Sequence, residues 1–388
     1  MAIYWEGIFA VFAILLFFGI LAYRRIPAPV LGLLVSVIII LILGMPMDKT
    51  LLGPYMSAAG SYFKNFWLVF FLGALYGAIM EKTGAALVIA EALLKFGRGY
   101  MAPVVIMTVT GILTYGGISG FVIFFTMWPI ALHVFRETNL PRKLIPAAIS
   151  AGTWTWSMVG PATPAIQNII PMKYLGTSPN AALGPGLAAI VIEFVLICGW
   201  LYWRAKTLVK NGETFDKDEV GLRLAAEGEK VLREKIRPPL WIAVAPLILL
   251  IFLFDVLKIP IETALIITVL IATLMLFKQI GGYKELLSIM NDGSQNGAMA
   301  ILNTACIVGF AGVMKETYIF KNLVDWLKTG VQLNPYWYVA ITTTILAGIA
   351  GSASGGLGAT FEALGDTFKA LPISMEAVHR IASISAGI

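Results

Sequence analysis

A series of long apolar stretches restricts the fold of this chain more than any other feature. Each is about as long as a helix that crosses the roughly 30 Å hydrocarbon core of a bilayer. Eight stretches qualify as crossings: residues 3–22, 28–47, 62–80, 144–160, 185–203, 239–256, 261–279 and 292–314. Only 13% of the residues are charged, about half of the share in soluble domains. Because helices satisfy their own backbone groups in lipid, we predict an all-α polytopic membrane protein surrounded by lipid.

Basic residues give the expected orientation of these crossings. Arg24 and Arg25 follow the first apolar stretch instead of preceding it, which is the reverse of a cleaved signal peptide. Alternating crossings then place the charged segment 204–237 in the cytoplasm, as the positive-inside rule requires. We therefore expect a multi-pass protein of a prokaryotic cell membrane with its N-terminus outside. Since this topology accounts for the net charge of +6, we expect no nucleic-acid partner.

The motif GGISG at residues 116–120 interrupts one of the most apolar parts of the chain. The arms on either side, 101–115 and 121–135, each reach only about 22 Å as helices, which is too short for a crossing. We predict a re-entrant hairpin that enters and leaves the membrane on one side, with its tip at GGISG. Irregular backbone at membrane depth is tolerated only where protein or a watery cavity surrounds it. The tip is therefore a candidate binding site.

The second half of the chain repeats the first. Adding 235 to the residue number converts Gly116 to Gly351 and Gly120 to Gly355, and the ISAG string at 149–152 recurs at 384–387. By the count of crossings the copies are inverted, and inverted repeats with interrupted helices are typical of secondary transporters. This predicts five segments: scaffold helices 1–60 and hairpin-bearing helices 61–203 of the first repeat, a linker 204–237, scaffold helices 238–290, and hairpin-bearing helices 291–388 of the second repeat.

A second interruption follows the first ISAG string. We expect Pro161 and Pro164 to break the helix there, with Thr163, Gln167 and Asn168 at the break. The second ISAG string runs directly into the last residue of the sequence. The repeat therefore predicts that the natural polypeptide continues with another broken helix and at least one more crossing.

Several motifs together resemble one family of transporters. They are TYGGISGFVIFFTMWPIAL, RKLIPAAISAGTWTWSMVGPATPAIQNIIP with LGTS after it, SASGGLGATFEALG and VHRIASISAG. From about residue 62 onward the chain resembles the gluconate permease family of proton-coupled symporters, within the ion-transporter superfamily. The resemblance implies a small carboxylate substrate, a homodimeric scaffold, and an elevator-type movement of a domain that holds two hairpins and two broken helices.

The candidate substrate-binding residues lie at the two tips and at the break. Free backbone amides at a helix N-terminus favour a carboxylate, and neutral side chains can hydrogen-bond a substrate without the cost of a fixed buried charge. The set consists of Gly117, Ser119, Gly120, Thr163, Gln167, Asn168, Ser352, Ser354 and Gly355. The candidates for proton transfer or anion access are His379, Arg380 and Glu193. His379 and Arg380 are equally consistent with interface anchors, and we expect no metal or cofactor.

We predict that this chain carries out proton-coupled symport of a small organic monocarboxylate, either a sugar acid or a short hydroxy acid, and that it is not an enzyme. Sodium coupling is one alternative and a channel is another. The string Gly117-Ile118-Ser119-Gly120 also resembles the GxSG nucleophile motif of intramembrane serine proteases. That chemistry needs a histidine base on a neighbouring helix, whereas His133 lies on the same hairpin. Close helix packing through small residues is the structural alternative for the tip.

Overall fold

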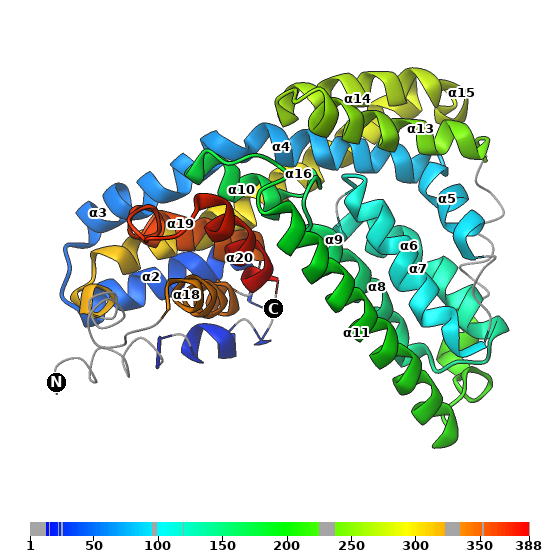
Figure 1. Ribbon diagram of the computed structural model, residues 1–388, viewed down its shortest axis with the longest axis horizontal. Coiled ribbons are helices and arrows are strands. Elements are labelled where there is room, and N and C mark those ends of the chain that lie inside the picture. The colour runs from blue at the N-terminus through cyan, green and yellow to red at the C-terminus, as the bar shows by residue number, and fades with distance from the viewer. Residues whose placement is uncertain are drawn as a thin grey trace. The chain divides into compact units, whose positions relative to one another are not determined.

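The computed structural model describes residues 13–14, 16–21, 23–24, 26–94, 99–118, 120–224, 237–322, 334–350 and 353–387. Every regular element in these ranges is helical (Figure 1), which confirms the predicted all-α class. Three helical stretches among them are long and apolar enough to cross a membrane: Met47–Lys82, Leu183–Lys210 and Tyr283–Glu316. Shorter apolar helices cover Ala28–Ile42, Gly99–Tyr115, Leu240–Val256 and Ile261–Met275. This set of helices is consistent with a polytopic membrane transporter.

Several helices of the first half recur in the same order in the second half. The first half contains α2 (Ala28–Ile42), α3 (Met47–Thr50), η1 (Leu51–Tyr55), α4 (Met56–Lys82), α5 (Ala85–Leu94), η2 (Gly99–Met101), α6 (Ala102–Tyr115), α7 (Gly120–Glu137), η3 (Arg142–Leu144), α8 (Ile145–Thr153), α9 (Trp156–Val159), α10 (Ile166–Leu175) and α11 (Leu183–Lys210). After η4 (Phe215–Lys217), the second half contains α13 (Leu240–Ile251), η5 (Phe252–Val256), α14 (Ile261–Met275), α15 (Phe277–Ile280), α16 (Tyr283–Glu316), α18 (Pro335–Ala350), α19 (Ala353–Lys369) and α20 (Met375–Ala386).

The displacement of 235 residues seen in the sequence also relates the helix ends. Tyr115, the last residue of α6, corresponds to Ala350, the last residue of α18. Lys82 at the end of α4 corresponds to position 317, one residue beyond the end of α16. The hairpin arms α6, α7, α18 and α19 contain 14, 18, 16 and 17 residues. At 1.5 Å per residue all four are shorter than the bilayer core, as the sequence predicts for hairpins.

The chain forms two compact units, and each holds one hairpin. The first unit consists of 1–70, 166–182 and 298–388, and the second of 71–165 and 183–297. In the first unit α10 packs against α19 and α20, and α18 packs against both of these helices (Figure 1). In the second unit α6 packs against α5, α7, α8, α9 and α11 (Figure 1). Both α4 and α16 contribute residues to each unit.

Small residues permit the closest helix contacts of the first unit. A Cβ atom at Gly32 of α2 would lie 2.5 Å from the backbone oxygen of Cys306 in α16. A Cβ atom at Gly356 would overlap the backbone of Ala347 in the opposite arm of the second hairpin. Such contacts are usual in membrane helix packing, and here they hold α2 to α16 and close the hairpin.

Residues 213–218 of the linker pair with the loop between α7 and α8, within the second unit. Arg142 donates to Asp218 at 2.6 Å, and Lys143 forms an ion pair with Glu213. Between these two pairs the ring of Phe215 is 1% exposed. The linker is therefore bound to the helical body over residues 213–218.

The predicted crossing at 144–160 is not one continuous helix. Helix α8 ends at Thr153 and the single turn α9 begins at Trp156. The Thr153 hydroxyl donates to the Ile149 carbonyl at 2.9 Å and the Ser157 hydroxyl to the Gly152 carbonyl at 2.6 Å. The Ser157 hydroxyl thus bonds a carbonyl in the last turn of α8, and the helix breaks before the prolines. The break predicted at Pro161 and Pro164 is confirmed, since α9 ends at Val159 and α10 begins at Ile166.

Candidate functional site

The tip of the first hairpin is a helix cap. The amide of Ile118 donates to the Leu113 carbonyl at 3.2 Å and the amide of Gly117 to the Thr114 carbonyl at 2.9 Å, which is the Schellman arrangement at the end of α6. It requires a left-handed residue, and Gly117 has φ 92°. The Gly116 amide also bonds within α6. The expectation of free amides is therefore wrong for residues 116–118, because these amides satisfy the last carbonyls of α6.

Packing around this tip explains why its residues are small. A Cβ atom at Gly117 would lie 2.6 Å from Leu250 of α13 and 3.2 Å from Pro164. A Cβ atom at Gly120 would lie 2.6 Å from the indole nitrogen of Trp154. Thr163 is fully buried in the break, where its hydroxyl accepts from the Ala165 amide at 3.3 Å. The second unit thus places Gly117 against Pro164, the neighbour of Thr163, and Gly120 against Trp154. Ser119 lies outside the described residues.

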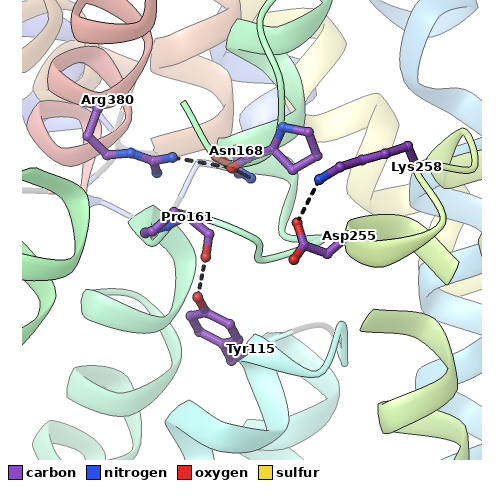
Figure 2. Close-up of polar contacts among 7 residues, drawn as sticks. Tyr115, Pro161, Asn168, Asp255, Lys258 and Arg380 are labelled. Carbon is purple, nitrogen blue, oxygen red and sulfur yellow. Dashed lines mark hydrogen bonds and ion pairs between the residues drawn. The ribbon is translucent and has the colours of Figure 1, made fainter. Parts of the chain in front are cut away.

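Tyr115 links the tip to the broken helix. Its hydroxyl donates to the Pro161 carbonyl, and Figure 2 shows the ring pointing from the end of α6 toward that carbonyl. One turn earlier in α6, Gly111 lies against the Trp156 ring of α9. Both contacts fasten the hairpin to the segment between α8 and α10.

The tip of the second hairpin lies in the first unit. Ser354 and Gly355 are buried in the first turn of α19, and Ser352 lies outside the described residues. Helix α10, which carries Gln167 and Asn168, packs against both α19 and α20. The ring of Tyr174, two turns along α10, stacks on Phe361 of α19 with centroids 5.4 Å apart.

Polar groups gather between α10, α20 and the loop 176–182 of the same unit. This α10–α20 site consists of Gln167, Asn168, Thr177, His379 and Arg380. His379 is fully buried and Arg380 is 2% exposed. The His379 Nε2 atom lies 2.9 Å from Asn168 Oδ1, and the His379 Nδ1 atom lies 2.7 Å from the Thr177 hydroxyl. Asn168 Nδ2 donates to the Pro179 carbonyl at 3.1 Å.

Arg380 binds the backbone of the loop 176–182. Its Nε and one terminal nitrogen donate to the Ala181 carbonyl at 3.1 and 2.9 Å, and the same terminal nitrogen reaches the Pro179 carbonyl at 3.4 Å. In Figure 2 the Arg380 and Asn168 side chains point toward one another. The loop carries left-handed backbone at both ends, with φ 68° at Gly176 and φ 48° at Ala182. The guanidinium therefore fixes a sharply turned segment.

The electrostatics of this site set it apart from ordinary packing. A buried arginine in a membrane helix costs about 2.5–3.5 kcal/mol on insertion scales and marks a functional site by default. Among the described residues, Gln167 Oε1 is a buried acceptor with no hydrogen-bond partner, and such groups normally find one. The arrangement thus combines a cation, a titratable ring and an acceptor that a ligand hydroxyl could satisfy.

Of the residues selected from the sequence, the first unit brings together Gln167, Asn168, His379 and Arg380. Glu193 belongs to α11 of the second unit, where it is half-buried. Sequence reasoning missed Thr177 and the carbonyls of the loop. Thr177 stands in the LGTS string directly after the broken helix, and that position was the available signal. Backbone carbonyls leave no signal in the residue types.

The fold is consistent with an all-helical polytopic membrane transporter that holds two helical hairpins. A family model described as CitMHS, citrate transporter, matches residues 8–360. The chain is also similar to the uncharacterized transporter YxjC of Bacillus subtilis (strain 168), with 31% identity over 374 residues that cover 86% of this chain and 78% of the relative. This protein belongs to the CitMHS citrate transporter family, within the ion-transporter superfamily. The gluconate permease family, which the motifs resemble, is not confirmed by these matches.

Proposed function

We propose that this protein is a proton-coupled symporter that carries a small organic hydroxycarboxylate across the cell membrane by an elevator movement. Membership of a transporter family supports transport, and no catalytic family is indicated. The N-terminus outside, the linker in the cytoplasm and a homodimeric assembly are parts of the same proposal. They derive from the charge pattern and from the resemblance to the superfamily.

The observation that carries the proposal is the burial of Arg380 beside His379. A positive charge that is 2% exposed attracts an anion strongly in surroundings of low dielectric. Its partners include the carbonyls of Pro179 and Ala181, and a carboxylate binds a guanidinium more strongly than such a neutral dipole does. The family description, citrate transporter, names a substrate of the same chemical class.

Gln167 favours a hydroxy acid over a simple carboxylate. Its buried Oε1 needs a donor, and a carboxylate supplies none, whereas a substrate hydroxyl does. Gln167 precedes Asn168 in α10. The main-chain carbonyl of Gln167 accepts a hydrogen bond from the Ser383 hydroxyl of α20 at 3.0 Å. Sugar acids, 3-hydroxybutyrate and citrate all carry a hydroxyl together with a carboxylate.

The experiment is uptake into proteoliposomes that contain the purified full chain. Radiolabelled gluconate, 3-hydroxybutyrate, glycerate, lactate, D-serine and citrate are offered under an imposed proton gradient or an imposed sodium gradient. We expect accumulation of at least one hydroxycarboxylate under the proton gradient and no effect of sodium. Accumulation that follows sodium and ignores pH would defeat the proton coupling, and accumulation of citrate alone would replace the monocarboxylate by a tricarboxylate.

Arg223→Met serves as the matched control in this assay because Arg223 is an exposed arginine of the linker. Arg380→Met should abolish accumulation, whereas Arg223→Met should transport as the unmodified protein does. Equal transport by both variants would remove the α10–α20 site from the proposal.

A further inference from the structure

His379 is held so that one particular nitrogen is available to a proton. The Asn168 amide is oriented because its Nδ2 donates to the Pro179 carbonyl at 3.1 Å. Its Oδ1 therefore faces His379 Nε2 at 2.9 Å. Since Oδ1 is only an acceptor, Nε2 must carry a hydrogen. In the neutral ring the remaining nitrogen, Nδ1, is then the acceptor.

Thr177 occupies the position next to this acceptor. Its hydroxyl lies 2.7 Å from His379 Nδ1, and a hydroxyl can either donate or accept. When the ring is neutral, the hydroxyl donates to Nδ1. When Nδ1 binds a proton, the hydroxyl can rotate and accept the new N–H, and the bond from Nε2 to Asn168 stays in place. The ring can thus gain or lose one proton without movement of the heavy atoms around it.

Burial and the nearby charges together determine when protonation of His379 is favourable. The titratable and charged groups on α20 and on the helices that pack against it are Glu376, Arg380, Lys173, Tyr174, Glu362, Asp366, Lys369, Tyr336 and Tyr338. Of these, Arg380 acts directly on His379 through its charge. A second buried cation beside Arg380 is unfavourable, but an anion bound at Arg380 removes this repulsion.

We propose that Nδ1 of His379 is the atom that binds the transported proton, with Thr177 and Asn168 as positioning residues, and that carboxylate binding at Arg380 makes this protonation favourable. The inference rests on the proposed function and specifies its coupling step. One proton from the outer solution binds Nδ1 as the anion binds, and both are released on the inner side. Because His379 and Arg380 are almost completely buried, exchange with solvent requires displacement of a packed segment such as the loop 176–182.

The test separates coupling from transport itself. Proteoliposomes are loaded with unlabelled citrate or 3-hydroxybutyrate, whichever the unmodified protein accumulates, and uptake of the labelled compound is measured with and without an inward proton gradient. Exchange needs only substrate movement, whereas accumulation needs the proton. We expect His379→Gln to lose proton-driven accumulation at least tenfold more than it loses exchange. Retention of proton-driven accumulation by His379→Gln would overturn the inference.

Thr177 provides an independent arm if His379→Gln fails to fold. Thr177→Val removes a hydroxyl that bonds the protonated ring more strongly than the neutral ring, so the pH of half-maximal uptake should fall by about one unit. Thr177→Ser should restore the original profile. Thr108→Val, which removes a hydroxyl that bonds within α6, is the control and should leave the profile unchanged.

An unshifted profile in Thr177→Val would contradict the role of Nδ1. Failure of the unmodified protein to accumulate any member of the panel under a proton gradient would instead contradict the proposed function. The two failures are distinguishable because the first appears only in the variants.

Discussion

Arg380 gives the sharpest test of the α10–α20 site, because replacement by methionine removes a buried charge and its bonds together. Methionine is similar in length and apolar, so the cavity left behind is small. Two well-made bonds are lost, at 3.1 and 2.9 Å, whereas the contact at 3.4 Å contributes little. Bonds that involve a charged group contribute about 1.5–3 kcal/mol each, so the loss is about 3–6 kcal/mol.

Removal of the buried charge acts in the opposite direction. Relief of the insertion cost returns about 2.5–3.5 kcal/mol. At the middle of both ranges the net loss of stability is about 1.5 kcal/mol. We therefore expect Arg380→Met to fold with a slightly lowered melting temperature in detergent and to lose transport almost completely. A structural role alone would instead give a stability loss with transport retained.

Two measurements check this reasoning: the thermal midpoint by size-exclusion chromatography of heated samples, and uptake in proteoliposomes. Arg380→Lys keeps the charge but lacks the planar fork that reaches the loop carbonyls from two nitrogens, so it should transport weakly. An Arg380→Met variant that melts and transports as the unmodified protein does would refute the role of Arg380 in both structure and function.

Two further predictions concern the tip of the first hairpin and residues 213–218 of the linker. Gly117→Ala should destabilise the protein more than Gly44→Ala. Both glycines have positive φ, at 92° and 62°, so an added side chain is strained by about 1 kcal/mol at each. Only at Gly117 would the new Cβ atom also lie 2.6 Å from Leu250, whereas Gly44 faces open space. Equal melting temperatures of the two variants would contradict the packing described for the tip. Asp218→Asn should lower stability by up to about 1 kcal/mol at neutral pH. The hydrogen bond from Arg142 holds the pKa of the Asp218 carboxyl below its usual range. The stabilisation by this pair is therefore present above the unfolded-state pKa and is lost as pH falls through the lowered folded-state pKa. Asp218→Asn and the unmodified protein should have equal melting temperatures at acid pH, and a difference that persists there would contradict the assignment.

The sequence predicts much of the fold because the relevant signals are local. Short apolar arms around glycine predict the hairpins, and the displacement of 235 residues predicts the repeated helix order. The early break at 154–155 is not predicted, because Thr153 and Ser157 are compatible with a helix interior and their residue types do not mark the break. The hydrogen bonds from the amides of Ile118 and Gly117 to the end of α6 likewise cannot be predicted from the residue types.

The candidate site is predicted only in part, for a similar reason. Gln167 and Asn168 attract notice as polar residues in a broken helix, and Arg380 as a charge in an apolar region. Their partners come from the loop 176–182. There the residue type of Thr177 does not indicate a binding role, and the acceptors are backbone carbonyls. Only the folded chain brings residues about 200 positions apart, such as Thr177 and His379, within hydrogen-bond distance.

Proton-coupled symport is tested most directly by following substrate and proton in one experiment. Proteoliposomes that contain the full chain and an internal pH-sensitive dye start with no imposed gradient, and a labelled carboxylate from the panel is added outside. We predict that the interior acidifies in step with uptake, and that this acidification is lost in His379→Gln. Uptake by the unmodified protein with no change of internal pH would contradict proton-coupled symport.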